Sequence, residues 1–422
     1  MTSSNTQGVT VAIAGAGLAG LCLAQRLVRA GIDVHVYEGD SGPFVRRQGY
    51  RITVDADGLG ALRASLPDQL YELALAVGGE PGGSFRFTNS RLRDAFTLTF
   101  KAAEDGERQM DRQTLRSILL MGLDERVHYG RAAVGVERGD ADQMVLRFAD
   151  GSSVSASIVV AADGIGSALR RQIAPGANPV DSGMAGIYGR TPLLQAGRSV
   201  LPEVLDNSGV LALGDEPGRA FFFTTMRFRQ APQQAFARLA PSRPAPAGDD
   251  YVMWGLVLRQ QEAPLGVRTD PQRLRELAAR LASGYHPLVH RLIESADDDT
   301  TILSTFAIGQ RPDAWPLPRA TVVGDAIHAM PPFGAHGGNT ALRDAALLGG
   351  KLVDAHLHGR SVESAIAAYQ TEMPSYAFKA VDTAAAMMRR LTGSGRVQRM
   401  VMTRLLPSLH RVTVPEPSII RA

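Results

Sequence analysis

The spacing of apolar residues changes twice before residue 39, and these changes predict a strand, a helix and a second strand. Residues 9–14 (VTVAIA) form a short apolar and β-branched run, and LCLAQRLVRAG (21–31) has apolar residues at helical spacing. IDVHVYE (32–38) then alternates in the manner of a strand. A strand, a helix and a strand of this size form a βαβ unit, the building block of a Rossmann-like α/β fold.

Three later patterns predict further elements of the same kind of domain. RQTLRSILLM (112–121) predicts a helix. The runs at 132–138 and 143–149 predict a β-hairpin, and 155–164 predicts a buried strand that enters a glycine turn. The first half of the chain therefore alternates helices and strands.

The character of the chain changes between about 180 and 310. Aromatic, β-rich runs alternate there with connectors rich in Pro, Ala and Gly, which predicts an inserted antiparallel β-sheet. A strand–turn pattern returns at 319–330, and helical patterns follow from about 338 and from about 361.

Composition indicates two domains and excludes some partners. The chain has 422 residues, and a single hydrophobic core rarely grows beyond about 250–300 residues. Hydrophobic residues make up 45% and charged residues 21%, with a net charge of +3, as in an ordinary water-soluble protein. No basic run is interleaved with aromatic residues, so we expect no nucleic acid among the partners. No obligatory protein partner is evident.

The single cysteine and the N-terminal residues bear on the compartment. Cys22 excludes an intrachain disulfide and indicates a reducing environment. The first residues lack a positive charge, and the apolar stretch behind them is too short to span a bilayer, so we expect a cytoplasmic protein. Segment 384–412 is basic and amphipathic. Membrane-surface binding is one interpretation, and a helix packed along the domain seam is the favoured one.

The first candidate site is a glycine-rich turn between the first strand and the helix. Gly15, Gly17 and Gly20 have GxGxxG spacing. The first glycine permits a sharp turn, the second lets the backbone approach a pyrophosphate, and the third lets the helix pack close to the strand. Glu38 ends the second strand, where a carboxylate can accept hydrogen bonds from both hydroxyls of a ribose. The combination predicts dinucleotide binding.

Two further constellations also follow strands. Asp163 and Gly164 end the run IVVAA, a place where loops meet a cofactor in α/β sheets, although an ordinary Asp-Gly turn is the alternative. Gly324 and Asp325 end the run TVV, and a Gly/Pro loop then leads into the helix that begins near Asn339. Such a helix start suits the edge of a flavin that becomes negative on reduction, and a plain helix cap is the alternative.

Taken in order, the three constellations resemble the class A flavoprotein monooxygenases, the p-hydroxybenzoate hydroxylase-like family. The segments that carry the resemblance are GAGLAG with Glu38, ADGIGSALR, and VVGDAIHAMPPFGAHGGNTALRDA. The likeness spans roughly 9–170 and 300–390, and the Arg-x-x-Leu element in MDRQTLRSIL fits it as well. The chain departs from the usual Pro-x-x-Gly-Gln-Gly loop, because it has GAHGGN at 334–339.

The resemblance implies an α/β fold with a Rossmann-like FAD-binding domain, an inserted and mostly antiparallel β-sheet substrate domain, and a C-terminal helical segment. The expected divisions are the first part of the FAD-binding domain at 1–178, the substrate-binding β-sheet region at 179–305, the second part of the FAD-binding domain at 306–360, and the helical segment at 361–422.

The resemblance also implies a chemistry. NAD(P)H would reduce FAD, O₂ would add at flavin C4a, and the resulting hydroperoxide would hydroxylate a small organic substrate. The oxidant belongs to the cofactor, so no metal and no catalytic side chain is required. Arg112 would approach the FAD pyrophosphate, and the loop at 44–55 would pass over the isoalloxazine ring. The expected cofactor-binding residues are Gly15, Gly17, Leu18, Ala19, Gly20, Glu38, Arg112, Asp163, Gly324, Asp325, Gly337, Gly338 and Asn339.

The aromatic runs of the middle region predict a bulky, largely apolar aromatic or polycyclic substrate. Strand alternation places Phe221 and Phe223 on one face of a strand and Phe222 on the other. One face would roof a pocket whose floor is the loop at 331–333, and the alternative is that both faces fill the core of the sheet. The candidate substrate-binding residues are Phe223, Met226, Trp254, Pro332 and Phe333.

Two other functions share the same motifs. One is an FAD-dependent epoxidase or olefin reductase of the same superfamily. The other is a flavin-binding sensor or partner protein without turnover. Oxidation of NADH, followed with and without candidate substrates, separates these interpretations.

Overall fold

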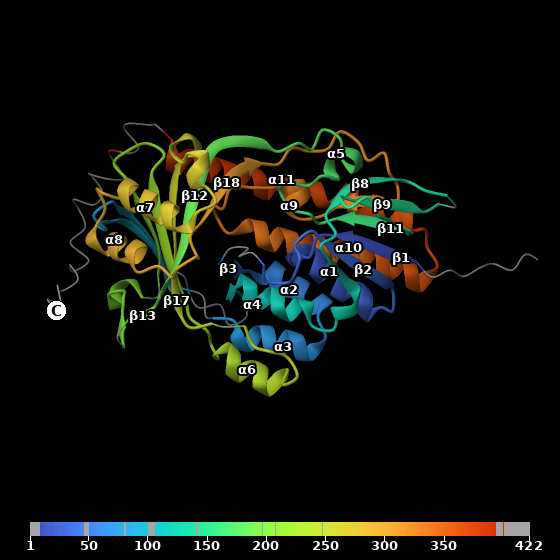
Figure 1. Ribbon diagram of the computed structural model, residues 1–422, viewed down its shortest axis with the longest axis horizontal. Coiled ribbons are helices and arrows are strands. Elements are labelled where there is room, and N and C mark those ends of the chain that lie inside the picture. Colours follow the sequence, from blue (N-terminus) through green and yellow to red (C-terminus); the bar gives the residue numbers. More distant parts are fainter. Residues whose placement is uncertain are drawn as a thin grey trace, which may run out of the picture.

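A computed structural model describes residues 9–45, 50–79, 82–99, 106–140, 142–195, 197–206, 208–246, 248–393 and 400. A nucleotide-binding half and a β-sheet half lie side by side, and a long helix runs from the first toward the second (Figure 1). This arrangement confirms the predicted α/β class with an inserted sheet.

The nucleotide-binding half is built on a five-stranded parallel sheet. Its strands, in spatial order, are β19 (Ala320–Val322), β11 (Ile158–Ala161), β1 (Thr10–Ala14), β2 (Asp33–Glu38) and β7 (Val127–Tyr129). All four residues of β11 are buried, as in a strand covered on both faces. The carboxyl ends of β1, β2, β11 and β19 therefore carry the three predicted constellations.

Helices pack around this sheet as the apolar spacing predicts. Helix α1 (Leu18–Arg29) packs against α10 (His336–His358), and α10 packs against α2 (Ala56–Ser65) and α11 (Val362–Thr392). The other helices of this half are α3 (Asp68–Val77), α4 (Arg112–Leu120), α5 (Arg170–Ile173) and α9 (Asp325–His328). The predicted helix at 112–121 and hairpin at 132–149 are confirmed.

Smaller sheets complete the described strands. The antiparallel sheet β10-β9-β8 contains the predicted hairpin, and β3 pairs with β6. The bounds are β3 (Arg51–Val54), β6 (Arg108–Asp111), β8 (Ala133–Arg138), β9 (Met144–Phe148), β10 (Ser153–Ala156), β13 (Leu194–Gln195) and β14 (Arg198–Ser199).

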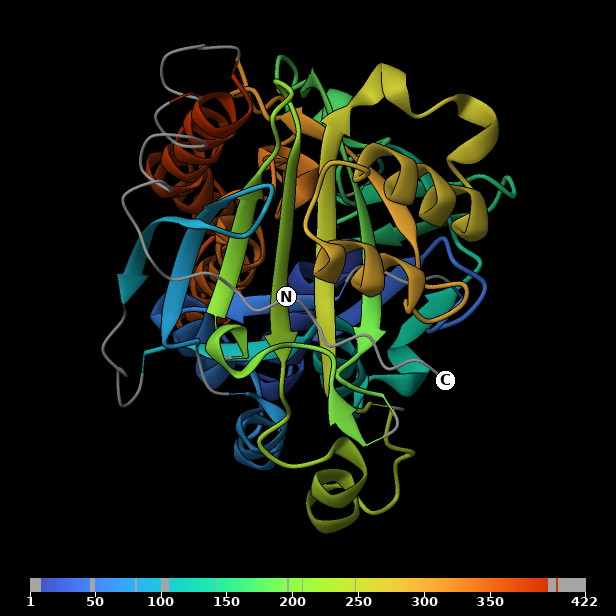
Figure 2. The ribbon, with the colours of Figure 1, turned by 90° about the vertical axis from the view of Figure 1, so that its left-hand side faces the viewer.

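The second half is a seven-stranded sheet, antiparallel except where β15 pairs with β4. Its spatial order is β18 (Ile302–Ile308), β12 (Val180–Pro192), β17 (Tyr251–Arg259), β16 (Ala220–Met226), β15 (Ser208–Leu213), β4 (Ser84–Asn89) and β5 (Asp94–Thr99). Helices α7 (Pro271–Leu281) and α8 (Pro287–Glu294) cover its outer face and stand in front of the strands in Figure 2. Helix α6 (Pro232–Leu239) packs against α3.

Strands β4 and β5 belong to this sheet, although the sequence placed them within the 1–178 part of the FAD-binding domain. The reason is aromatic packing across strands distant in sequence. Phe85 on β4 stacks on Phe222 of β16 with ring centroids 6.0 Å apart, and Phe87 stacks on Phe96 of β5 at 4.3 Å. The substrate half therefore draws on two separate stretches of chain.

Near its C-terminal end, helix α11 packs against the β-sheet half. Met388 is buried in an apolar cluster with Phe333 and with residues of the sheet. The start of the basic segment at 384–412 therefore packs along the seam between the domains, as the favoured interpretation predicted. Residues 394–399 and 401–412 of that segment lie outside the described residues. Among the residues described, no helix is long and apolar enough to cross a membrane.

Candidate cofactor and substrate site

The glycine turn after β1 has the packing that its spacing predicts. Gly15 has φ +108°, and a Cβ there would overlap the carbonyl oxygen of Ala162 at the end of β11. A Cβ at Gly20 would overlap the carbonyl oxygen of Gly15. Gly17, at the N-cap of α1, has no atom within 4 Å of its Cβ position. The turn therefore packs tightly against the protein at Gly15 and Gly20 and leaves open space beside Gly17.

Glu38 is held beside this turn. Its carboxylate is 6% exposed and accepts hydrogen bonds from the backbone N–H groups of Ala16 at 2.8 Å and Asp40 at 3.0 Å. Each carboxylate oxygen retains a lone pair for another donor. Leu18 and Ala19 are buried in the first turn of α1, so only their backbone groups are available to a ligand.

Helix α4 carries two arginines that bear on the candidate site, and sequence reasoning identified only one of them. Arg112 is the first residue of α4, and its Nε is buried without a hydrogen-bond partner among the described residues. Arg116 donates from Nε to the carbonyl of Ala16 at 2.8 Å and also contacts the carbonyl of Pro43. The i, i+4 spacing, which puts both side chains on one helix face, was the signal for Arg116.

The second constellation forms a tight turn beside the first. Asp163 Oδ2 accepts from the N–H of Ala168 at 3.0 Å, whereas its Oδ1 is buried and has no hydrogen-bond partner in the described part of the chain. Burial raises the pKa of this carboxyl. Arg170 donates to the carbonyl of Ala326 at 2.9 Å and so ties this turn to the third constellation.

Gly324 and Asp325 form the third constellation at the end of β19. Gly324 has φ +65°, and Asp325 is an exposed residue at the start of α9. The carboxylate of Asp325 forms no hydrogen bond or ion pair with other described residues, and its Oδ1 lies 3.9 Å from a Cβ position at Gly337. Asp325 is therefore free to bind a ligand hydroxyl beside the start of α10.

The start of α10 brings together the remaining predicted residues. Gly337, Gly338 and Asn339 lie in its first turn. The Asn339 side chain accepts from the N–H of Asp55 at 3.0 Å and donates to the carbonyl of Thr53 at 2.9 Å. It therefore fixes the helix start against β3.

A buried network beneath Gly324 was missed by the sequence analysis. Asp344 of α10 is 0% exposed and accepts from Gly324 N at 2.8 Å, from His328 Nε2 at 2.6 Å and from the Tyr376 hydroxyl at 2.7 Å. Burial by itself lowers the pKa of His328, but the charge and hydrogen bond of Asp344 outweigh it, so the pKa is raised. The sequence feature that could have indicated this network is that Asp344 lies on the apolar face of α10, four residues before the buried Leu348.

The structure separates the predicted substrate residues. Phe223 and Trp254 are 0% exposed and pack in the core between the sheet and helices α7 and α8. The expected alternation along β16 holds, but this face is the outer one, so these two residues do not meet the cofactor-binding turns. Met226 packs with Tyr50 and Tyr251 instead.

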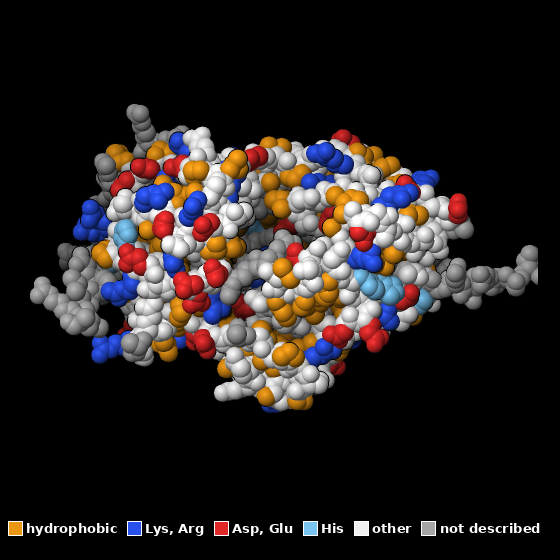
Figure 3. Space-filling model, viewed as in Figure 1, with side chains coloured by type: hydrophobic (Ala, Val, Ile, Leu, Met, Phe, Trp, Pro, Cys, Tyr) orange, Lys and Arg blue, Asp and Glu red, His pale blue; other side chains and the backbone are white. Residues whose placement is uncertain are grey.

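An apolar cluster joins the inner face of the sheet to the third constellation. Phe333 is buried in it, whereas the neighbouring Pro332 is exposed. The surface between the two halves is hollowed on the face seen in Figure 3. The sheet, the loop at 331–333 and α11 contribute Phe87, Leu211, Leu213, Ala220, Val257, Phe306, Phe333 and Met388, with Phe85, Phe96, Met184, Tyr188, Phe222, Ile308, Met387 and Leu391 packed against them.

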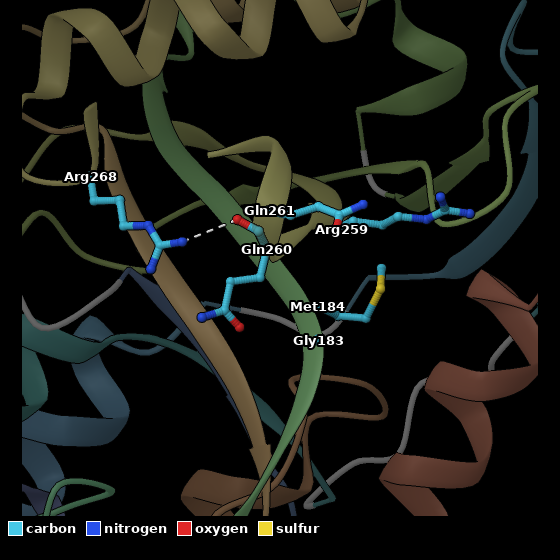
Figure 4. A pocket seen from close by; sticks show the side chains of 6 residues that line it. All are labelled: Gly183, Met184, Arg259, Gln260, Gln261 and Arg268. Carbon is cyan, nitrogen blue, oxygen red and sulfur yellow. Dashed lines mark hydrogen bonds between the residues drawn. The ribbon is translucent and has the colours of Figure 1, made fainter. Parts of the chain in front are cut away.

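A separate open pocket of about 530 Å³ lies at one end of β12 and β17 (Figure 4). Arg259, Arg268, Gln260 and Gln261 give it a polar lining. Arg268 donates to the carbonyl of Gln260 at 3.2 Å. None of the predicted site residues lines this pocket, so it is not the cofactor site.

The residues present fit FAD. Open space at Gly17, the unpaired Arg112 Nε and the unpaired Asp163 Oδ1 are features of a site shaped for a polar ligand. Cys22 is buried, and burial raises the pKa of its thiol to about 11, which argues against covalent attachment. The loop expected over the isoalloxazine (44–55) includes 46–49, which lie outside the described residues. In the rest, no group of three or more metal-ligating side chains could hold a metal ion.

Comparison with known families and proteins identifies the chain. Residues 127–384, well over half of it, match the family model described as FAD binding domain, and residues 13–65 match the NAD(P)-binding Rossmann-like domain. The chain is 30% identical over 344 residues to 2-heptyl-3-hydroxy-4(1H)-quinolone synthase of Pseudomonas aeruginosa, covering 81% of this chain and 80% of that protein. The chain belongs to the FAD-dependent class A monooxygenases.

Two further monooxygenases resemble this one. The dual O-methyltransferase/FAD-dependent monooxygenase CTB3 of Cercospora beticola is 30% identical over 414 residues, which cover 91% of this chain and 46% of that protein. The chain thus spans about half the length of that relative. The crystal structure of an FAD containing monooxygenase from Photorhabdus luminescens superposes with a TM-score of 0.75 at 27% identity, covering 92% of this chain and all of that one.

Proposed function

We propose that this monooxygenase uses NAD(P)H and O₂ to hydroxylate a bulky, largely apolar aromatic or polycyclic substrate, bound between the seven-stranded sheet and the third constellation. The observation that carries the proposal is the apolar cluster that links Phe333 with the inner face of the sheet. A surface of this kind, rich in phenylalanine and poor in charge, favours flat apolar ligands.

The roles proposed for the cofactor-binding residues follow their places. Gly15, Gly17 and Gly20 admit the ADP half of FAD, and Glu38 binds its ribose. Arg112 pairs with the pyrophosphate, because its buried Nε lacks a partner among the described residues.

Residues of the third constellation receive the flavin end. Asp325 would accept from a ribityl hydroxyl, and the N–H groups of Gly337 and Gly338 would stabilise the negative charge of the reduced flavin. When bound, FAD supplies the redox chemistry that draws electrons from NAD(P)H and activates O₂. The side chains of this enzyme orient the ring and the substrate and exclude water from the space between them.

The name of the Pseudomonas aeruginosa relative supports the substrate class, because it specifies a quinolone with an alkyl chain. A fused aromatic ring of that kind matches an aromatic-lined site. The side chains that form the apolar cluster carry no charge, which disfavours a small carboxylate as the ligand.

A substrate screen tests the proposal. NAD(P)H oxidation by the FAD-loaded enzyme is measured with simple hydroxybenzoates and with polycyclic phenols, and each product is checked by mass spectrometry for the gain of one oxygen atom. We expect polycyclic phenols to stimulate oxidation and to gain oxygen. Efficient oxygenation of hydroxybenzoates alone would show that the proposed substrate class is wrong.

A further inference from the structure

Tyr188 occupies an unusual place on the inner face of the sheet. On β12 it lies directly opposite Gly255 of β17, and Gly186 precedes it on the same face. A Cβ at Gly186 would lie 2.6 Å from the Tyr188 hydroxyl, and one at Gly255 would lie 2.7 Å from the ring carbons Cδ1 and Cε1. The ring therefore lies flat across two strands, in the space that two side chains would otherwise take.

The two glycines are required because they leave space for the tyrosine ring, and not because the backbone needs a conformation that only glycine adopts. Neither Gly186 nor Gly255 has a positive φ. An alanine would therefore adopt their backbone conformation without strain, and only the tyrosine ring excludes it. Glycine in a strand interior also weakens a sheet. The need to accommodate the Tyr188 ring explains why two glycines nevertheless occur here.

The hydroxyl of Tyr188 forms no hydrogen bond with the other described residues. The side chain is half-buried, and its neighbours in the apolar cluster include Phe222, Met184 and Val257. Burial alone raises the pKa of the phenol, so the group is a neutral donor at physiological pH. The hydroxyl of Tyr251, in contrast, donates to Asp111 Oδ2 at 2.8 Å.

We propose that Tyr188 recognises the substrate by donating a hydrogen bond to an oxygen atom on its aromatic ring. The site would then prefer hydroxylated or oxo-substituted fused rings to the bare hydrocarbons. Tyr188 packs against both the Phe333 cluster and the Met226 cluster, so its hydroxyl lies where the two apolar clusters meet. This inference rests on the proposed function and specifies the group that orients its substrate.

Paired probes test the proposal by binding, independently of turnover. The dissociation constants of 2-naphthol and naphthalene are measured for the FAD-loaded enzyme from the change in flavin absorbance. We expect the preference for 2-naphthol to fall by roughly fivefold to tenfold in Tyr188→Phe. The matched control is Tyr71→Phe, since Tyr71 lies on α3 and contacts Arg63, and it should leave the preference unchanged.

A second variant tests the glycine support. Gly255→Ala retains the hydroxyl but displaces the ring, so we expect it to lose the preference as Tyr188→Phe does. An unchanged preference in Tyr188→Phe, an unchanged preference in Gly255→Ala, or a wild-type enzyme that binds 2-naphthol no better than naphthalene would each overturn the assignment.

These outcomes are distinct from failure of the proposed function. If polycyclic phenols are oxygenated while Tyr188→Phe keeps the full preference, the role of Tyr188 is wrong and the function stands. If the FAD-loaded enzyme oxygenates no polycyclic phenol, the proposed function fails, and the binding ratio still decides the role of Tyr188.

Discussion

Alanine substitutions at two glycines of the first turn should affect different properties: one should lower the stability of the protein, and the other should weaken FAD binding. A Cβ at Gly20 would overlap the carbonyl oxygen of Gly15 and lie 3.2 Å from the Cβ of Ala162. That carbonyl cannot retreat easily, because the N–H of Gly15 donates to the carbonyl of Tyr37 at 2.7 Å. A Cβ at Gly17 meets no atom within 4 Å, and its φ of −79° suits alanine.

The magnitudes follow from these contacts. Gly20→Ala should lower the free energy of unfolding of the apoprotein by roughly 1–3 kcal/mol, the usual cost of overpacking. Gly17→Ala should change it by less than about 1 kcal/mol, since the loss of unfolded-state entropy offsets the weaker N-cap. If the FAD pyrophosphate lies against Gly17, the added methyl group should cost about 1.5–3 kcal/mol of binding, or roughly ten- to a hundredfold in Kd.

Two assays separate these effects. Urea denaturation of the apoproteins measures stability, and quenching of flavin fluorescence measures FAD affinity. The account requires Gly17→Ala to fold normally and bind FAD weakly, and Gly20→Ala to be destabilised before any cofactor is added. A Gly17→Ala protein with wild-type FAD affinity would refute the proposed course of the pyrophosphate.

Three other predictions concern the remaining constellations and the way the flavin is held. Asp325→Ala should weaken FAD binding by about 1.5–3 kcal/mol, and Asp163→Ala much less, so equal flavin contents of the two purified variants would contradict the assigned roles. Because Asp344 raises the folded-state pKa of His328, the stability from this pair is fully present below the unfolded pKa of about 6.5 and is lost as pH rises through the folded value. His328→Asn should therefore cost more free energy of unfolding near pH ~5 than near pH ~9, and equal costs in urea titrations would disprove the pairing. Acid precipitation should release all flavin, since Cys22 is buried; colour retained in the pellet would argue for a covalent link.

The local sequence pattern was sufficient to predict the main elements of the nucleotide-binding half. The turn at Gly15–Gly20 and the position of Glu38 follow from residues close in sequence, because a βαβ unit forms from neighbouring segments. The helix at 112–121 and the hairpin at 132–149 were predicted for the same reason.

The pairing of strands that are distant in sequence could not be predicted from the local pattern. Strand β4 joins the sheet by pairing with β15, with Ser84 opposite Ser208, and nothing in the local pattern of residues 84–89 specifies that partner. Strand alternation likewise separated Phe222 from Phe223, but which face meets the cofactor depends on where α7 and α8 pack. The contacts of Asp344 depend on the crossing of α10, β19 and α11, which no sequence spacing determines.

The origin of the inserted oxygen atom tests the central claim most directly. The polycyclic phenol that best stimulates NAD(P)H oxidation is converted by the FAD-loaded enzyme under heavy-isotope dioxygen in ordinary water, and the product is analysed by mass spectrometry. The account predicts that one heavy oxygen atom enters each product molecule. A product that carries only light oxygen, or consumption of NAD(P)H with no oxygenated product, would contradict it.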